Sequence, residues 1–365
     1  VCTAFSTPTS ILHFIAFKFE KIAMNWSILL WILFTLLKNT TVSVCVPRHN
    51  VTALTIGQDL QSIFKYSVAL KHIAYPFAVM SYISFSLKND TIAGLEFPVD
   101  YGSGVEWVEG LINAFNGSSI QLGLWISDSY DSISTGKYDK SLQILSNYVS
   151  KTNRAFYLRI GYEFDSVANN FDPEIYRIAF RYIVAYFRKE NVINVAFVWH
   201  AAGFQPKDSL SYDAWFPGAD VVDWCGVSLF QQPYYCGTQS NCTSMYYADK
   251  FANYCSERRL PLMIAESTPF GGITDVSPSS QTSTSSNSKP TRATVNRAGY
   301  VGDTWEIWFE PVLAYIDRHD VRMWSYINCN WDIQPMWRTQ HAPGIYWGDT
   351  RIEGKEYVSL CAFQC

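Results

Sequence analysis

The chain has 365 residues, of which 48% are apolar and 16% charged, a composition that excludes an intrinsically disordered protein and provides for a large core. Its formal net charge is −4 and its lysines and arginines form no run, which argues against nucleic acid and against an anionic membrane as partners. Aromatic residues are frequent, with 13 Trp and 23 Tyr, and they suit both sugar stacking and an ordinary core.

The first predicted element is a secretory signal peptide. An apolar run over residues 28–37 follows Met24, is too short for a comfortable membrane span, and precedes small residues at Thr41 and Ser43 that offer a cleavage site. We therefore expect residues 1–23 to be non-native upstream sequence, residues 24–44 to be removed, and residues 45–365 to be secreted without a membrane anchor. A signal anchor that begins further upstream is the alternative.

Eight short runs rich in apolar and β-branched residues follow and predict strands. They span residues 53–56, 77–85, 120–126, 156–162, 195–199, 222–229, 262–265 and 321–327. Helical patterns separate most of these runs, most clearly over residues 141–149 and 173–187, where apolar positions recur at spacings of three and four. Asp172 and Pro173 supply an N-cap and a first helical residue for the second of these helices.

This alternation of strand and helix predicts an α/β protein with a single closed parallel barrel, the (β/α)₈ or TIM barrel. An open doubly wound sheet is the runner-up, but it requires a Gly-rich first turn that the sequence lacks. After the seventh strand, residues 275–292 are rich in Ser and Thr and have no apolar periodicity. We expect an insertion there that lies over the carboxyl face of the barrel, as a tolerated loop or as a lid.

Cysteine usage also predicts export. One cysteine, Cys2, lies in the upstream segment, and the other eight are Cys45, Cys225, Cys236, Cys242, Cys255, Cys329, Cys361 and Cys365. Their spacings differ from those of zinc sites and so predict disulfides made in an oxidising compartment. The pairing stays open; a Cys236–Cys242 bond and a bond from Cys45 to a C-terminal cysteine are two of the arrangements. Four sequons in residues 45–365 predict N-glycans, at Asn50, Asn89, Asn116 and Asn241.

Two carboxylates stand at the ends of predicted strands. Glu163 ends the fourth strand and Glu266 ends the seventh, each after a strongly apolar run. Strands four and seven of a closed barrel lie across the mouth from each other, where strand-end side chains converge. One carboxylic acid that protonates a leaving oxygen and one carboxylate that attacks an anomeric carbon are the groups of retaining glycoside hydrolysis. Arg159 is expected to keep one of them ionised; the alternative is that each glutamate caps a helix or pairs with an arginine.

Several segments resemble those of glycoside hydrolase family 26. The resemblance lies in residues 159–165 (RIGYEFD), 198–201 (VWHA), 216–227 (FPGADVVDWCGV) and 263–266 (MIAE), with 56–59 (IGQD) similar to the family's first strand. It covers most of residues 50–330 and implies a retaining (β/α)₈ hydrolase with Glu163 as general acid/base and Glu266 as nucleophile. Tyr162 replaces the histidine of the family's mannanases, and Phe230 lies near the place of their tyrosine, so the preferred sugar stays open.

Other residues are expected to bind sugar. Trp324, near the end of the eighth strand, resembles the tryptophan platform of this clan of hydrolases, with core packing as its alternative. His200 ends the fifth strand beside Trp199 and is expected to bond a substrate hydroxyl or to steady a carboxylate. Trp199, Arg159 and Tyr162 are further candidates for substrate binding. The candidates for outer subsites are Trp125, Asp59, Trp331 and Trp337.

Other chemistries lack their motifs. No two histidines have metal-ligand spacing, and the sequence contains no G-x-S-x-G elbow, P-loop or dinucleotide fingerprint. We therefore expect neither a metal nor a cofactor. The combined prediction is a secreted retaining hydrolase of a β-linked polysaccharide such as mannan, xylan or β-glucan. The alternative is an extracellular carbohydrate-binding or matrix protein that keeps the barrel without turnover.

Overall fold

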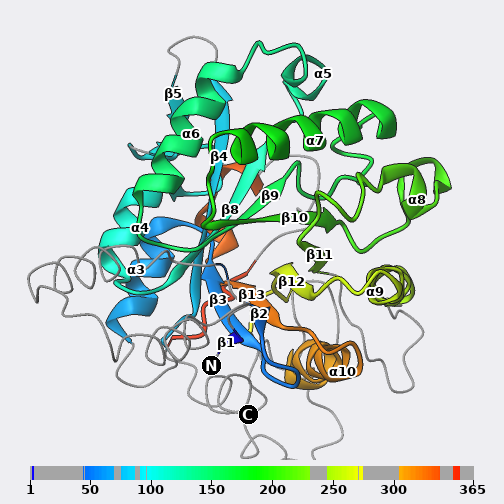
Figure 1. The fold of residues 1–365 in the computed structure, drawn as a ribbon. Helices are drawn as coiled ribbons and strands as arrows, with labels where there is room; N and C mark the ends of the chain where they lie inside the picture. The colour runs from blue at the N-terminus through cyan, green and yellow to red at the C-terminus, as the bar shows by residue number, and fades with distance from the viewer. Residues whose placement is uncertain are drawn as a thin grey trace, which may run out of the picture.

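The protein forms a closed barrel of eight parallel strands (Figure 1). The computed structural model describes residues 2–3, 44, 46–69, 75–86, 91–95, 97–230, 245–269, 271–273, 304–337 and 348–353. In chain order the barrel strands are β3 (Ala53–Gly57), β4 (Ala78–Ser86), β8 (Ser119–Trp125), β9 (Phe156–Ile160), β10 (Val195–Ala201), β11 (Trp224–Leu229), β12 (Leu262–Ser267) and β13 (Met323–Ile327). Each pairs with the next, and β3 also pairs with both β13 and β4, which closes the ring.

The barrel confirms the predicted fold class and all eight predicted strands, with ends that differ by at most two residues. Short strands that carry no apolar run were not predicted. They are β5 (Thr91–Ala93), antiparallel to β4, the hairpin of β6 (Val99–Asp100) with β7 (Val105–Glu106), and β1 (Cys2–Thr3), antiparallel to β2 (Val46–Pro47). Residues 24–43 of the expected signal peptide and the whole insertion at 275–292 lie outside the described residues.

Helices cover the outside of the barrel (Figure 1). The longest is α7 (Pro173–Lys189), whose N-cap, Asp172, accepts hydrogen bonds of 2.9 and 3.0 Å from the backbone N–H groups of Glu174 and Ile175. The other α-helices of the described residues are α3 (Leu60–Val68), α4 (Val108–Ala114), α5 (Tyr130–Ile133), α6 (Asp139–Lys151), α8 (Tyr212–Trp215), α9 (Tyr246–Glu257) and α10 (Glu310–Arg318). Single turns of 3₁₀-helix occur at η1 (Lys207–Ser209), η4 (Trp331–Ile333) and η5 (Pro335–Trp337), and π-helix η3 (Trp305–Phe309) precedes α10.

Each barrel strand contributes to two cores, because successive side chains point to opposite faces. Outward side chains pack with the helices in one large core, to which Leu158 and Ile160 of β9 belong. Inward side chains fill the barrel with a second, smaller cluster that includes Tyr157, Ala196 and Met263. Whether a residue on a barrel strand faces the helices or the barrel interior is therefore decided by its position in this alternation.

A disulfide ties a barrel strand to a helix. Cys225 on β11 bonds Cys255 on α9, and both are fully buried. This is a different arrangement from the two considered from the sequence, whose cysteines lie outside the described residues. Cys329 is a buried free thiol, so the expectation that the eight cysteines pair off is not met by this one.

Candidate active site

Glu163 lies just beyond β9, at the carboxyl face of the barrel. Its backbone has a φ of 54°, in the left-handed region that few non-glycine residues occupy. The side-chain amide of Asn169 holds this bend by donating hydrogen bonds of 2.8 and 2.9 Å to the carbonyl oxygens of Tyr162 and Glu163. The Glu163 carboxyl group is half-buried, and its Oε1 accepts a 2.7 Å hydrogen bond from Ser228 Oγ.

Glu266 reaches the barrel interior through an irregularity in β12. Ala265 belongs to the interior cluster, so a regular strand would turn the next residue, Glu266, toward the helices. However, the consecutive residues Val227 and Ser228 of β11 pair with Ile264 and Glu266, respectively. Ala265, which lies between these partners, is therefore an extra residue at a β-bulge. Bulges re-aim side chains. This one points Glu266 into the barrel, on the same side as Ala265.

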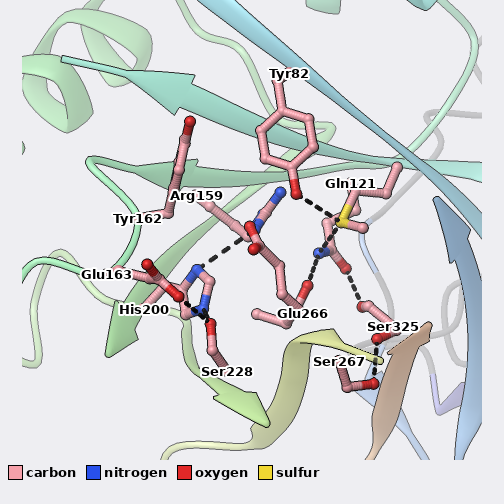
Figure 2. A network of polar contacts seen from close by, with 12 residues as sticks. Tyr82, Gln121, Arg159, Tyr162, Glu163, His200, Ser228, Glu266, Ser267 and Ser325 are labelled. Carbon is pink, nitrogen blue, oxygen red and sulfur yellow. Dashed lines mark hydrogen bonds and ion pairs between the residues drawn. The ribbon is translucent and has the colours of Figure 1, made fainter. Parts of the chain in front are cut away.

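A buried chain of polar contacts joins the two glutamates (Figure 2). Arg159 Nη1 forms an ion pair with Glu266 Oε1 and lies 3.4 Å from His200 Nδ1. His200 Nε2 lies 2.9 Å from Ser228 Oγ, which donates to Glu163. Because a guanidinium only donates hydrogen bonds, His200 Nδ1 faces it as an acceptor and the imidazole proton sits on Nε2. The donors therefore point in one direction, from Arg159 through His200 and Ser228 to Glu163.

The electrostatic environment separates the two carboxyl groups. Burial, and then the nearby Glu266 carboxylate, raise the pKa of Glu163 to about 8, while the hydrogen bond from Ser228 lowers it. Burial and the charge of Arg159 push the pKa of His200 well below its usual value, so the imidazole is neutral. Burial alone would lower the pKa of Arg159, but the charges and hydrogen bonds of Glu266 and Tyr82 together outweigh burial and raise that pKa. At neutral pH, Glu163 is mostly protonated beside a Glu266–Arg159 ion pair.

Three half-exposed aromatic rings adjoin these charges. Tyr162 packs edge-on against Tyr82 with ring centroids 5.4 Å apart, and its ring centroid lies 5.8 Å from that of Trp125. The guanidinium of Arg159 lies 5.0 Å from the ring centroid of Tyr82 and 5.3 Å from that of Tyr162. Aromatic faces of this kind stack on the C–H groups of sugars. We call Tyr82, Trp125 and Tyr162 the aromatic wall.

The structure overturns two predicted sugar contacts, Trp199 and Trp324. The Trp199 ring is fully buried and stacks on Phe164 at a centroid distance of 4.5 Å, on the helix side of β10. Trp324 is 3% exposed, packs near Trp308 and donates through Nε1 to Ser267 Oγ at 2.8 Å. Both predictions were wrong because each ring faces outward from the barrel and is buried against other aromatic side chains.

Two polar candidates are also engaged within the protein. Asp59 is 6% exposed and caps α3, accepting a 3.0 Å hydrogen bond from the backbone N–H of Ser62, and Gln334 Nε2 lies 3.4 Å from its other oxygen. His200 is fully buried between Arg159 and Ser228 and has no free nitrogen for a substrate hydroxyl. Local hydrogen bonds already occupy both residues, which argues against a sugar contact for either. For His200 the contacts fit the other expected role, that of steadying a carboxylate, which it does through Ser228.

The remaining predicted residues come together at the mouth. Arg159, fully buried, holds Glu266, and Tyr162 and Trp125 stand in the aromatic wall. Of the two outer-subsite candidates, Trp331 is 2% exposed in an inner cluster with Phe230, and the side chain of Trp337 lies outside what the structure describes.

Sequence reasoning missed several residues of the site. They are Ser228, Tyr82 and Gln121, the last of which donates a 2.7 Å hydrogen bond to the carbonyl oxygen of Ala265. Strict alternation along predicted strands would have placed Tyr82 and Gln121 inside the barrel, but nothing in their immediate sequence indicates a partner.

Neither a metal cluster nor a membrane span is found in the part of the chain that the structure describes. No group of three or more His, Cys, Asp or Glu side chains among those residues is arranged to hold a metal ion. No helix within the same ranges is long and apolar enough to cross a membrane.

Two curated proteins match most of the chain. A β-1,3-xylanase of a Vibrio species, named TXYA, and a β-1,3-xylanase of an Alcaligenes species are each 27% identical over 317 residues, or 86% of this chain. The chain spans 64% and 62% of the lengths of these relatives. The observed barrel and the predicted resemblance to a glycoside hydrolase agree with this match. The chain is a (β/α)₈ protein that is similar to glycoside hydrolases over most of its length.

Family models and solved structures provide two further comparisons. No protein-family model matches the chain. A solved GH26 β-mannanase from Bacteroides ovatus aligns with 84% of this chain and with 87% of its own, at a TM-score of 0.49 and 11% identity.

Proposed function

We propose that the chain is a secreted retaining glycoside hydrolase that cleaves a β-linked polysaccharide by double displacement. Because the curated relatives are named β-1,3-xylanases, β-1,3-xylan is the first substrate to test, with mannan, β-1,4-xylan and β-glucan as the wider class. In this proposal residues 45–365 are the catalytic domain and residues 24–44 a signal peptide, with 1–23 as upstream sequence. N-glycans are proposed for the four sequons, of which Asn50 and Asn116 are exposed and Asn89 and Asn241 lie outside the described residues.

One observation carries the proposal: a chain of contacts through Arg159, His200 and Ser228 links the carboxyl groups of Glu266 and Glu163 at the mouth of the barrel. Glu163 has a pKa of about 8, whereas Glu266 pairs with the permanent positive charge of Arg159. A protonated acid and an ionised carboxylate, close enough for the charge of one to affect the other, are the groups that glycoside hydrolysis requires.

The first step transfers the sugar to the enzyme. A Glu266 oxygen attacks the anomeric carbon from one face, and the bond from that carbon to the leaving sugar's oxygen breaks. Glu163 gives its proton to that oxygen, so the leaving sugar departs as a neutral alcohol. Since Ser228 occupies Oε1 of Glu163, Oε2 is the oxygen that carries the proton.

The second step returns both glutamates to their starting states. Glu163, now a carboxylate, accepts a proton from a water molecule, whose oxygen attacks the anomeric carbon and displaces Glu266. The product keeps the β configuration because each step inverts it once. The neutral Nε2–H form of His200 holds Ser228 in place throughout, since the serine proton points to Glu163.

Substrate turnover tests the proposal directly. The purified chain is incubated with β-1,3-xylan, β-1,4-xylan, mannan, β-glucan and chitin, the products are sized by mass spectrometry, and the first-formed anomer is identified by NMR. We expect oligosaccharides from one β-linked polymer that appear first as the β-anomer. Product of inverted configuration would exclude the double displacement, and the absence of products from every polymer would exclude hydrolysis of this class.

A carbohydrate-binding protein without turnover is the second candidate. Two departures from the family pattern favour it: Tyr162 in place of histidine, and Phe230, which is packed in an apolar cluster. Replacing Glu266 with Gln separates the candidates, because the side chain keeps its shape and loses its nucleophilic charge. A hydrolase loses turnover and retains bound polysaccharide, whereas a binding protein shows the same affinity as before and no turnover in either form.

A further inference from the structure

The bulge at Ala265 decides where Glu266 points, so whatever holds the bulge acts on the proposed nucleophile. Adding one residue to β12 interrupts the ladder with β11 between Val227 and Ser228. Backbone groups at such an interruption lose regular ladder partners and must be satisfied in another way when they are buried.

Gln121 of β8 contacts the bulge from across the barrel (Figure 2). Its side chain is fully buried, and Nε2 donates a 2.7 Å hydrogen bond to the Ala265 carbonyl oxygen. The same Nε2 lies 3.3 Å from Met80 Sδ, and Oε1 accepts a 2.6 Å hydrogen bond from Ser325 Oγ. The two ends of the amide are thereby fixed in opposite directions, which leaves one orientation for the side chain.

A second contact links this amide to the residue after the nucleophile. Ser267 Oγ donates a 2.8 Å hydrogen bond to the carbonyl oxygen of Ser325 and accepts one of 2.8 Å from Trp324 Nε1. Residues 265 and 267, on either side of Glu266, are therefore both tied to the group of side chains around Ser325. Trp324, which is not a sugar platform, takes part in this arrangement from the outer face of the barrel.

We propose that Gln121 is a positioning residue that aims Glu266 by holding the carbonyl of the bulged Ala265. The inference rests on the proposed function, since it assigns Gln121 a part in the same reaction without contact to the sugar. Without the amide donor, the buried Ala265 carbonyl loses its partner, and β12 gains by relaxing toward a regular strand. A regular strand turns Glu266 away from Arg159 and from the anomeric carbon.

The test compares Gln121→Leu and Gln121→Glu with wild type, using Gln143→Leu, an exposed glutamine on α6, as the matched control. We expect Gln121→Leu to lower kcat about 100-fold, the cost of misplacing a reacting group by about 1 Å, with KM changed less than about threefold. Gln121→Glu keeps the shape, and its protonated carboxyl donates to Ala265 as the amide does. Its kcat relative to wild type should therefore rise as the pH is lowered from 8 to 5.

Each outcome decides the inference. A Gln121→Leu variant with kcat near wild type, a loss that lies wholly in KM, or a Gln121→Glu ratio that is independent of pH would overturn it. If Gln121→Leu does not fold, the pH dependence of the isosteric Gln121→Glu variant decides alone. If wild type hydrolyses no polysaccharide, the proposed function has failed separately, and crystal structures of wild type and Gln121→Glu at pH 8 decide. Glu266 unmoved beside Arg159 in both would then refute the positioning role.

Discussion

Ser228 Oγ donates a 2.7 Å hydrogen bond to Glu163 Oε1, and this bond opposes the burial that raises the pKa of Glu163 to about 8. A hydrogen bond to the charged form of an acid favours ionisation. Ser228 thus tunes the protonation of Glu163 from β11, which is separated from β9 by β10 in the barrel.

The alkaline limit of activity should report Glu163. Its protonated form is required for the first step, so kcat/KM should fall as the pH rises through about 8. Ser228→Ala removes the bond that favours the carboxylate, and the limit should move upward by about one pH unit. The pH profile of kcat/KM measures this shift. Ser256→Ala, at an exposed position on α9, is the control, and an unchanged limit in Ser228→Ala would contradict the assigned role.

Removing the acid should make the rate depend on the leaving group. Glu163→Ala is expected to lower turnover of the polysaccharide about 10²- to 10⁴-fold, the usual contribution of general acid catalysis. Hydrolysis of an aryl glycoside with a dinitrophenolate leaving group needs no proton in the first step, so burst-phase release of that group should stay near the wild-type rate. The exposed Glu190→Ala serves for comparison. Equal losses on both substrates would point to a structural role for Glu163.

Two tryptophans should behave in opposite ways. Trp125 is half-exposed in the aromatic wall. Replacing it with Ala should raise KM about tenfold, which corresponds to a loss of about 1.4 kcal/mol of binding free energy, with little change in thermal stability. Trp199 is fully buried on the helix side of β10. Replacing it with Ala should lower the free energy of unfolding by about 3 to 5 kcal/mol. Steady-state kinetics and thermal denaturation separate the two, and a KM effect confined to Trp199→Ala would reverse the assignment.

The Cys225–Cys255 disulfide should stabilise the fold by closing a loop of the chain. The two residues are 30 positions apart, and a loop of that size is worth about 3 to 4 kcal/mol of unfolding free energy. When both proteins are measured without reductant, the double variant Cys225→Ala, Cys255→Ala should have a lower melting temperature than wild type. Melting at the wild-type temperature would mean that the bond contributes nothing.

The sequence located the barrel strands and the two carboxylates because both depend on short stretches of chain. Apolar runs form strands wherever both faces are covered, and a polar residue that ends such a run lies at the mouth of the barrel. Trp199 and Trp324 were misassigned because lying near a strand end does not say which face a side chain takes. The alternation that decides the face depends on register within the closed sheet.

Glu266 is the sharpest case of what the sequence leaves undecided. The run from Leu262 to Glu266 by itself indicates a regular strand, in which the glutamate would face the helices if Ala265 faces inward. Only the assembled barrel brings Gln121, 144 positions earlier, to the Ala265 carbonyl. The chain's own pattern therefore determined the number, type and order of its elements, because local burial sets them. The partners of each polar atom were decided by the tertiary structure, because strands distant in sequence meet only when the ring closes.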